Sequence, residues 1–135
     1  YIMADAEEEP AEEVTPVLVA RRSLGPNPEA MAVLDLSQAR LVDVSPLAGM
    51  CPNLTLLHLQ GNNISKLPPS LFRLSNLAKL DLSHNAIRAI PPREFWEQVP
   101  GLRVLYLHHN PLKSLRNISS LACLPRLVRL TLHHC

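Results

Sequence analysis

The sequence is poor in aromatic residues and glycine, and it has no long apolar run. Aromatic side chains make up only 4% of the 135 residues, while 47% of all residues are hydrophobic, so aliphatic side chains must fill the core. Glycine occurs four times, and none of these positions belongs to a glycine-rich phosphate-binding loop. No apolar stretch reaches the roughly 18 residues that a membrane-spanning helix needs. We therefore expect one aliphatic domain that neither cradles a nucleotide nor spans a membrane.

Cysteine is also scarce. The chain contains Cys51, Cys123 and Cys135, and an odd number at such wide spacing is not a disulfide framework. The first residues contain neither the basic region nor the apolar region of a secretory signal. Both observations favour a reducing, cytoplasmic compartment.

The charge is distributed unevenly along the chain. The formal net charge is only +1, but six of the twelve acidic residues lie before Val14, and no basic residue precedes Arg21. From Val14 onward, thirteen basic residues stand against six acidic ones, a balance of +7. Residues 1–14 are therefore predicted to be an acidic, disordered tail in front of a mildly basic domain.

Leucine recurs at fixed intervals, and this periodicity is the strongest signal in the sequence. The pattern L-x-x-L-x-L-x-x-N-x-L fits five times, with repeats starting near residues 31, 54, 77, 102 and 127. It is identified as the pattern of the leucine-rich-repeat proteins. It predicts an α/β solenoid for residues 29–135, a right-handed superhelix with short parallel strands on the concave face and short α- or 3₁₀-helices as convex returns.

The ninth position of the pattern is expected to be structural. An asparagine side chain there can bond to backbone groups of the neighbouring turn, where no strand partner exists. The first repeat has Ala39 instead, which cannot make these bonds and marks that repeat as degenerate. Because cysteine is the known substitute at this position, the predicted ladder consists of Asn62, Asn85, Asn110 and Cys135.

The two ends of the solenoid are expected to differ. Thr15 followed by Pro16 is typical of a helix start, so residues 15–28 are predicted to form an N-terminal capping helix and a loop. No such cap follows the fifth repeat, which stops at Cys135, and this predicts a truncated C-terminal end. Within the returns, paired prolines favour helix starts, and Trp96 is expected to be partly buried.

The variable positions of each strand face the concave side, where proteins of this kind usually bind their partners. All six histidines of the chain lie at these positions together with three basic side chains, which suggests a partner with an acidic surface. The candidate binding residues are His58, Lys79, Asp81, His84, Arg103, Tyr106, His108, His109, Arg129, His133 and His134.

Three interpretations of the histidines are open at the level of sequence. Imidazoles on strands about 4.8 Å apart could share a zinc ion, but only Cys135, which the repeat already uses, could complete the set. The second is a pH-sensitive binding face, since histidine titrates near pH 6.5. The third, which we favour from the sequence, is that histidine fills solvent-facing polar positions. We therefore expect no metal and no cofactor.

No catalytic arrangement is evident in the sequence. Asp81, Ser83 and His84 lie along one strand and do not converge in a pocket, as a triad must. The chain has no His-Glu-x-x-His motif and no paired Cys-x-x-Cys. Tyr106 is the only aromatic residue at the concave positions, which disfavours stacking on nucleic-acid bases. We expect a non-enzymatic protein that binds another protein, and neither nucleic acid nor membrane.

Residues 77–135 carry a more specific resemblance. Phe95-Trp96, LRVLYLHHN at 102–110, LRNI at 115–118, Pro125 and Leu130-Thr131 are similar to the repeats of the leucine-rich-repeat and IQ-motif proteins, which are associated with cilia and flagella. This resemblance implies a cytoplasmic scaffold of the axoneme, with axonemal or microtubule-associated proteins as partners. No IQ motif is visible in this sequence.

A second resemblance gives an alternative. The Leu-x-x-Ile-x-x-Leu return at residues 115–121 looks like those of the leucine-rich-repeat regulatory subunits of phosphatases. It implies a regulator of a phosphatase or another signalling enzyme, rather than a fixed structural component.

Overall fold

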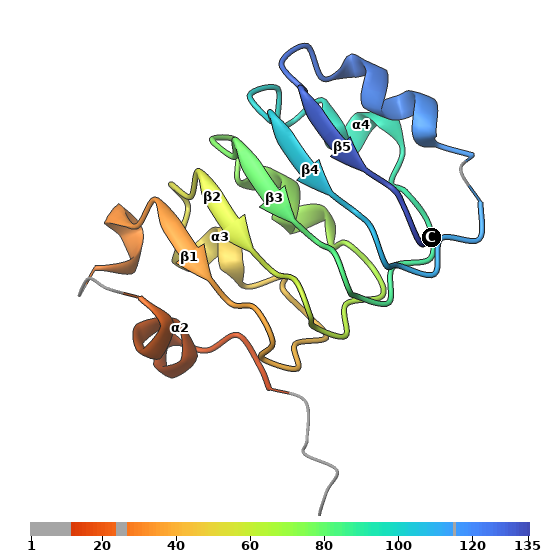
Figure 1. The fold of residues 1–135 in the computed structure, drawn as a ribbon. Coiled ribbons are helices and arrows are strands. Elements are labelled where there is room, and N and C mark those ends of the chain that lie inside the picture. The colour runs from red at the N-terminus through yellow and green to blue at the C-terminus, as the bar shows by residue number, and fades with distance from the viewer. Residues whose placement is uncertain (1–11, 24–26, 115) are drawn as a thin grey trace, which may run out of the picture.

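Five short strands form a single parallel sheet and lie side by side in chain order (Figure 1). The computed structural model describes residues 12–23, 27–114 and 116–135 of the chain. Neighbouring strands pair at the same positions of the repeat, which confirms the predicted α/β solenoid. The strands are β1 (Val33–Asp35), β2 (Leu56–His58), β3 (Lys79–Asp81), β4 (Val104–Tyr106) and β5 (Arg129–Thr131).

Helical segments connect the strands on the convex side (Figure 1). They are four to six residues long, because each returns the chain over the width of one repeat. Prolines precede or open the first three returns, as predicted for the paired prolines at 68–69 and 91–92, since proline needs no N–H partner in the first turn of a helix. The last return instead begins after Asn117. The helical segments are η1 (Pro28–Ala30), which precedes β1, and the returns α3 (Leu47–Met50), η2 (Pro69–Arg73), α4 (Arg93–Trp96) and η3 (Ile118–Cys123).

Alternate side chains of the strands point into an aliphatic core. Leu34, Leu57, Leu80 and Leu105 are at most 1% exposed. The repeat pattern also predicts a core position at Leu115, which lies outside the described residues. Buried side chains from the convex returns meet the strand leucines from the other side, and they include Leu47, Leu71, Leu74, Val99, Leu121 and Leu124. Removal of this apolar surface from water is the main stabilising contribution to the fold.

Trp96 is fully buried, so the expectation of partial burial is wrong. Its indole N–H donates to the carbonyl oxygen of Pro91 at 2.9 Å, and this bond allows the polar atom of the ring to leave water. The ring of Phe72 packs edge-on against both Trp96 and Phe95, with centroids 5.1 and 5.2 Å apart. The few aromatic residues of the returns therefore form one cluster behind the sheet.

Helix α2 (Pro16–Arg22) lies against the first strand and covers that end of the sheet (Figure 1). The hydroxyl of Thr15 accepts a hydrogen bond from the backbone N–H of Leu18 at 3.2 Å, which is the predicted N-cap contact. Leu18 and Val19 are buried in the common core. The helix thus shields the strand edge that the first repeat would otherwise expose.

Residues 12–14, which were predicted to belong to the disordered tail, are attached to the first repeat. Val14 is buried in the core, and Glu12 forms a parallel bridge with Leu41 and an ion pair with Arg40 at 3.3 Å. The prediction of disorder up to residue 14 is therefore wrong for residues 12–14, because one apolar side chain and these pairings attach them to the first repeat. Residues 1–11, and residues 24–26 of the predicted loop, lie outside the described residues.

Asparagine side chains close the turns that follow the strands. Oδ1 of Asn110 accepts a hydrogen bond from the backbone N–H of Ile87 at 3.1 Å, and its Nδ2 donates to the carbonyl oxygens of Leu82 and Leu107 at 2.9 Å each. One amide therefore joins two consecutive repeats where the strand ladder has ended. Equivalent bonds are made by Asn62 and Asn85.

The first and fifth repeats replace this asparagine in different ways. Sγ of Cys135 donates to the carbonyl oxygen of Leu107 at 3.3 Å, one repeat back, which is the direction in which the asparagines donate. Ala39 has no polar side chain, and its backbone N–H donates to Oδ1 of Asn62 at 3.0 Å. The side chain of Asn62 in the second repeat therefore provides the hydrogen-bond partner for the turn of the first repeat.

Replacing Asn110 with alanine is expected to destabilise the domain by about 2 kcal/mol or more, because buried backbone groups of two repeats lose their partners. Urea unfolding monitored by circular dichroism would measure the loss. The matched control is Asn63→Ala, since Asn63 is exposed and directly follows the ladder residue Asn62. We expect a change below about 0.5 kcal/mol for this control. Equal stabilities for the two variants would contradict the structural role of the ladder.

Candidate functional site

The candidate binding residues form three bands across the concave side. In the first band, Arg103 lies directly before β4, at the edge where the strands begin. The middle band consists of the outward-facing strand residues His58, Lys79, Asp81, Tyr106 and Arg129. The third band follows the carboxyl ends of β3, β4 and β5 and consists of His84, His108, His109, His133 and His134. The structure therefore separates one histidine from the other five.

Lys79 and Tyr106, from adjacent strands, contact each other in the middle band. Nζ of Lys79 lies 5.4 Å from the centroid of the Tyr106 ring, a distance at which a cation is attracted to the ring face. Oδ1 of Asp81 accepts hydrogen bonds from the N–H and the hydroxyl of Ser83, at 3.0 and 2.7 Å. Because Lys79 and Arg129 outnumber this one carboxylate, basic side chains dominate the charge that the band offers to a partner.

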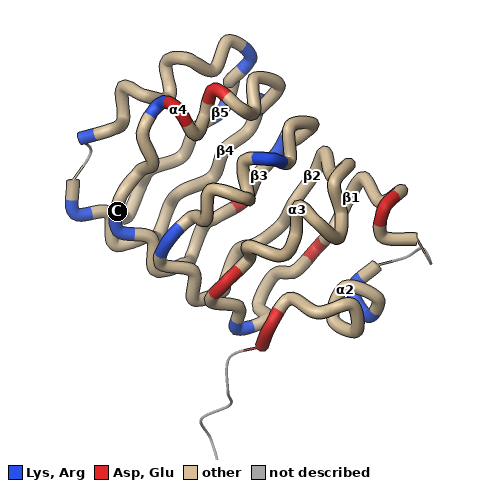
Figure 2. Tube along the Cα trace, turned by 180° about the vertical axis from the view of Figure 1, so that it is seen from behind, with Lys and Arg blue, Asp and Glu red and all other residues tan. Residues whose placement is uncertain are grey.

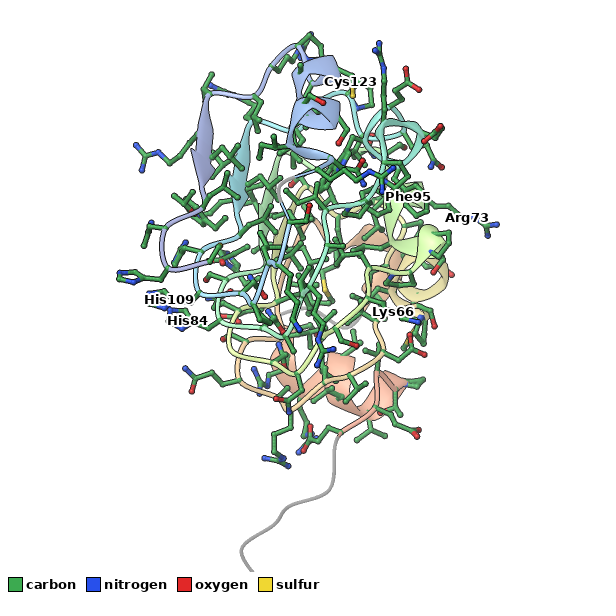
Figure 3. All side chains as sticks on the ribbon, turned by 90° about the vertical axis from the view of Figure 1, so that its right-hand side faces the viewer. Lys66, Arg73, His84, Phe95, His109 and Cys123 are labelled. Carbon is green, nitrogen blue, oxygen red and sulfur yellow. The ribbon has the colours of Figure 1, made fainter. Side chains whose placement is uncertain are left out.

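Five histidines form one patch, called the histidine cluster below. His84, His109 and His134 stack face to face in a first column, with ring centroids 4.2 and 4.5 Å apart. His108 and His133 stack in a second column at 4.5 Å. Edge-on contacts of 5.3 to 5.7 Å join the two columns. Figure 3 shows His84 and His109 projecting together from the strand side of the domain, away from the convex returns.

The backbone of the repeat fixes this arrangement. His84, His109 and His134 have left-handed backbones, with φ of 56°, 58° and 57°. The N–H of His84 donates to the carbonyl oxygen of His108 at 3.0 Å, and the same bond recurs one repeat later. A side chain in this region costs roughly 1 kcal/mol relative to glycine, and the second repeat does use Gly61 here. The cluster thus holds three histidines where glycine would fit more easily.

Desolvation and repulsion from the other rings favour the neutral forms of His108 and His109. Desolvation lowers the pKa of His108, and repulsion from His133 lowers it further, while the Asp81 carboxylate acts in the opposite direction. Desolvation also lowers the pKa of His109, together with repulsion from the four other histidines. Both pKa values are lowered from the ordinary value near 6.5, so these two rings are mainly uncharged at neutral pH.

Thr131 is a site residue that the sequence analysis missed. Its hydroxyl Oγ1 lies 2.6 Å from Nδ1 of His108, and the two atoms share a hydrogen bond between neighbouring repeats. Thr131 is paired with Tyr106 in the sheet register, so it lies on the same face as the middle band. The repeat alignment contained this signal, because it brings Thr131 next to the histidine band, but the residue type alone did not suggest it.

A groove of about 630 Å³ lies on a flank of the domain, outside the three bands. Apolar side chains that line it include Ile90, Pro91 and Phe95, and its charged lining residues are Lys66 and Arg88. Figure 3 shows the labelled Lys66 and Phe95 on the side of the domain opposite to the histidine cluster. Turns of successive repeats together build this groove, so no single sequence motif predicted it.

The geometry supports neither a metal centre nor a catalytic triad. Among the residues that the structure describes, no three His, Cys, Asp or Glu side chains are grouped so that they could hold a metal ion. Ser83 is buried, and its hydroxyl donates to Asp81. His84 is exposed and stacks on His109 instead of approaching Ser83. The three residue types of a triad are thus present on one turn without its geometry.

Comparisons with known proteins agree with the repeat pattern. The family described as leucine rich repeat matches residues 52–112. Human leucine-rich repeat and IQ domain-containing protein 3 is 36% identical over 85 residues, which make up 63% of this chain and 14% of that protein. Pig fibromodulin is 35% identical over 116 residues, covering 84% of this chain and 74% of the matched sequence. This chain belongs to the leucine-rich-repeat proteins.

Solved structures share the fold of this leucine-rich-repeat chain. A chain of the Drosophila melanogaster SNF/U2A′ complex is 25% identical with a TM-score of 0.71, covering 91% of this chain and 70% of that one. An internalin of Listeria monocytogenes is 26% identical with a TM-score of 0.67, covering 76% and 28% of the two chains. Leucine-rich repeats are generally non-catalytic binding modules. In the part of the chain that is described, no helix is both long and apolar enough to cross a membrane.

Acidification from pH 7.5 to 5.5 is expected to lower the melting temperature of this leucine-rich-repeat domain. The folded state lowers the pKa of His108 and His109, whereas the unfolded chain keeps values near 6.5. Below about pH 6.5 the unfolded state therefore binds more protons than the folded state, so the free energy of unfolding decreases as the pH is lowered. His109→Asn should reduce this slope, because asparagine tolerates the left-handed backbone and removes one ring from the cluster. Scanning calorimetry at several pH values would measure both slopes.

The control is Asn63→Ala, since Asn63 is exposed and lies outside the cluster, and it should keep the slope of the wild type. Asp35 does not interfere in this window. A hydrogen bond from Ser37 lowers the pKa of Asp35, so its contribution to stability is lost only well below pH 5. Identical slopes for the wild type and His109→Asn would contradict the repulsion within the cluster.

Proposed function

We propose that this leucine-rich-repeat chain is a non-catalytic scaffold that binds an acidic partner protein on its concave side. The observation that supports this most directly is the basic group of Lys79, Arg103 and Arg129, which lie at the same or adjacent register positions of three successive repeats. Arg103 and Arg129 are exposed. Charges arranged in this way accelerate the encounter with an acidic surface and select its orientation.

The distribution of charge along the solenoid also favours the later repeats as the binding region. In Figure 2, acidic and basic segments are mixed near α2 and β1, while basic segments predominate in the later repeats apart from the acidic residues at α4. Near the N-terminal end, Glu12 is paired with Arg40, so part of the basic charge there is neutralised. An acidic partner would therefore be attracted most strongly towards β3, β4 and β5.

The composition of the middle band supports a protein as the partner. The Tyr106 ring under the Lys79 ammonium group offers a flat, amphipathic contact of the kind that is enriched at protein interfaces. A single-stranded nucleic acid would instead require several aromatic rings along one track. The proposal accordingly involves protein partners, and neither nucleic acid nor a membrane surface.

We further propose a cytoplasmic location in the axoneme of a cilium or flagellum, with axonemal or microtubule-associated proteins as partners. The support is the similarity to human leucine-rich repeat and IQ domain-containing protein 3, of whose length this chain spans only 14%. The free cysteines Cys51, Cys123 and Cys135 are compatible with a reducing compartment.

The alternative is a regulatory subunit of a phosphatase or another signalling enzyme. The flank groove is the observation that favours it. Its apolar lining, with Phe95 and Ile90 beside Asn117 at the start of η3, could hold an enzyme away from the concave side. The fold would then serve a soluble complex instead of a fixed assembly.

Reversing the three basic charges together, as Lys79→Glu, Arg103→Glu and Arg129→Glu, should weaken partner binding at least about tenfold without unfolding the domain. Immobilised domain would capture partners from an extract of ciliated cells, and quantitative mass spectrometry would compare the variants. The matched control carries Arg73→Glu, Arg88→Glu and Arg126→Glu, which changes the net charge equally at exposed positions outside the three bands. Loss of capture in the control alone would place the interface on another surface, such as the groove that Arg88 lines, and contradict the proposal.

Extraction behaviour should separate the two proposed roles. In ciliated cells, the tagged full-length protein is expected to stay with detergent-extracted axonemes and to leave them only in high salt, because charge mediates its attachment. Affinity purification of the detergent-soluble fraction provides the comparison. A phosphatase catalytic subunit recovered there in equal amount, with no protein left on axonemes, would favour the regulatory alternative.

A further inference from the structure

The histidine cluster concentrates five titratable rings in a patch that has little negative charge of its own. Each ring contacts at least two others of the cluster. Asp81 is the only carboxylate that acts on His108, and none acts on His109, among the residues that the structure describes. Asp81 itself accepts two hydrogen bonds from Ser83. Protonation of the five rings therefore adds more positive charge than the single carboxylate of Asp81 can balance.

In the part of the chain that the structure describes, no carboxylate other than Asp81 acts on His108 or His109. On the β3 side lie Asp81 and the ammonium group of Lys79, which rests on the Tyr106 ring. On the β4 side, Tyr106 contacts His108 at 5.9 Å between centroids. On the β5 side, the neighbour is the neutral hydroxyl of Thr131. A bound molecule that carries carboxylates would accordingly supply counter-charge to a protonated cluster.

We propose that the histidine cluster is a proton-coupled docking site for the acidic face of a partner helix, whose carboxylates supply the missing counter-charge. This inference rests on the proposed scaffold function and adds a partner chemistry to it. Glutamates at positions i and i+4 of a helix lie about 5–6 Å apart. The rings within a column of the cluster are separated by 4.2 to 4.5 Å, so successive carboxylates could face successive rings.

A metal ion suits the patch less well. Rings stacked within 11° to 18° of parallel present their nitrogens side by side instead of towards one point. Metal coordination needs convergent ligands, and in the described ranges no such set of ligands occurs. A row of carboxylates, by contrast, can pair with protonated rings one by one, and the stacked rings offer such separate positive charges in a line.

Binding of carboxylates reverses the effects that hold the rings neutral. The free cluster disfavours the charged form, as shown by the lowered pKa of His108 and His109. Nearby carboxylates favour the charged form and raise each pKa, so the complex takes up protons. Affinity must therefore rise as pH falls through the region near 6.5. If two rings each gain half a pKa unit, the increase is about tenfold.

The test uses two synthetic 16-residue alanine-rich helical peptides, one with glutamate at every i, i+4 position and one with glutamine instead. Their affinities for the domain would be measured by fluorescence anisotropy at pH 7.5 and 5.5 in low salt after treatment with chelator. We expect the glutamate peptide to bind about tenfold tighter at pH 5.5, and the glutamine peptide to show no such gain. Histidine ring signals in NMR spectra should report a raised pKa in the complex.

The variant that removes the first column combines His84→Asn, His109→Asn and His134→Asn, which suit the left-handed backbone at these positions. It should lose most of the gain at pH 5.5, while the control Asn63→Ala, at an exposed position outside the three bands, keeps it. A full gain in the column variant would overturn the proposal. If that variant does not fold, the ring titrations of the wild type decide, and a ring pKa unchanged by the glutamate peptide would overturn it.

Other outcomes separate this inference from the scaffold function. If charge reversal at Lys79, Arg103 and Arg129 abolishes capture of cellular partners but the glutamate peptide binds equally at both pH values, only the proton coupling fails. Failure of both capture and peptide binding would refute both. Tight zinc binding that blocks the peptide would identify a metal site instead. A shift of the wild-type ring pKa values on deleting residues 1–10 would identify the chain's own acidic segment as the occupant and overturn the proposal.

Discussion

Each strand of this solenoid is only three residues long, so the backbone ladder between repeats ends almost as soon as it begins. The chain then turns, and its N–H and C=O groups must find partners inside the protein. The amide of Asn110 meets this requirement in both directions, accepting from Ile87 and donating to the carbonyl oxygens of Leu82 and Leu107. Because Asn62, Asn85 and Asn110 repeat the same closure, the turns of the second, third and fourth repeats follow similar paths.

Similar turns place equivalent residues directly above one another, and the concave surface is therefore built from columns. Histidines that recur at one position of the repeat form a stack, as His84, His109 and His134 do. Lys79 meets Tyr106 for the same reason, since their strands are neighbours. The candidate site is thus an extended patterned surface, which suits recognition of another macromolecule better than the enclosure of a small substrate.

The sequence predicts the periodic part of the structure well, because leucines and asparagines recur in it at fixed spacing. One arrangement of the chain both buries these leucines and gives the asparagine side chains hydrogen-bond partners. The sequence does not predict contacts that depend on the orientation of one particular group or on a partner in another segment. The burial of Trp96 depends on the Pro91 carbonyl oxygen pointing at the indole, and the attachment of Glu12 depends on Arg40 in another segment. For the histidines, the repeat predicted neighbours, but the stacking and the shared hydrogen bond to Thr131 depend on rotamers that no pattern encodes.

The aromatic cluster behind the sheet has a mechanical consequence. The strands in front are separated by about 4.8 Å, the spacing that backbone hydrogen bonds impose. Behind them, η2 and α4 must accommodate the rings of Phe72, Phe95 and Trp96, which meet edge-on at 5.1 to 5.2 Å between centroids. A stack whose back is wider than its front has to bend towards the front. The bulk of these three rings therefore helps to set the curvature of the solenoid, and with it the radius of the partner surface that the front can embrace.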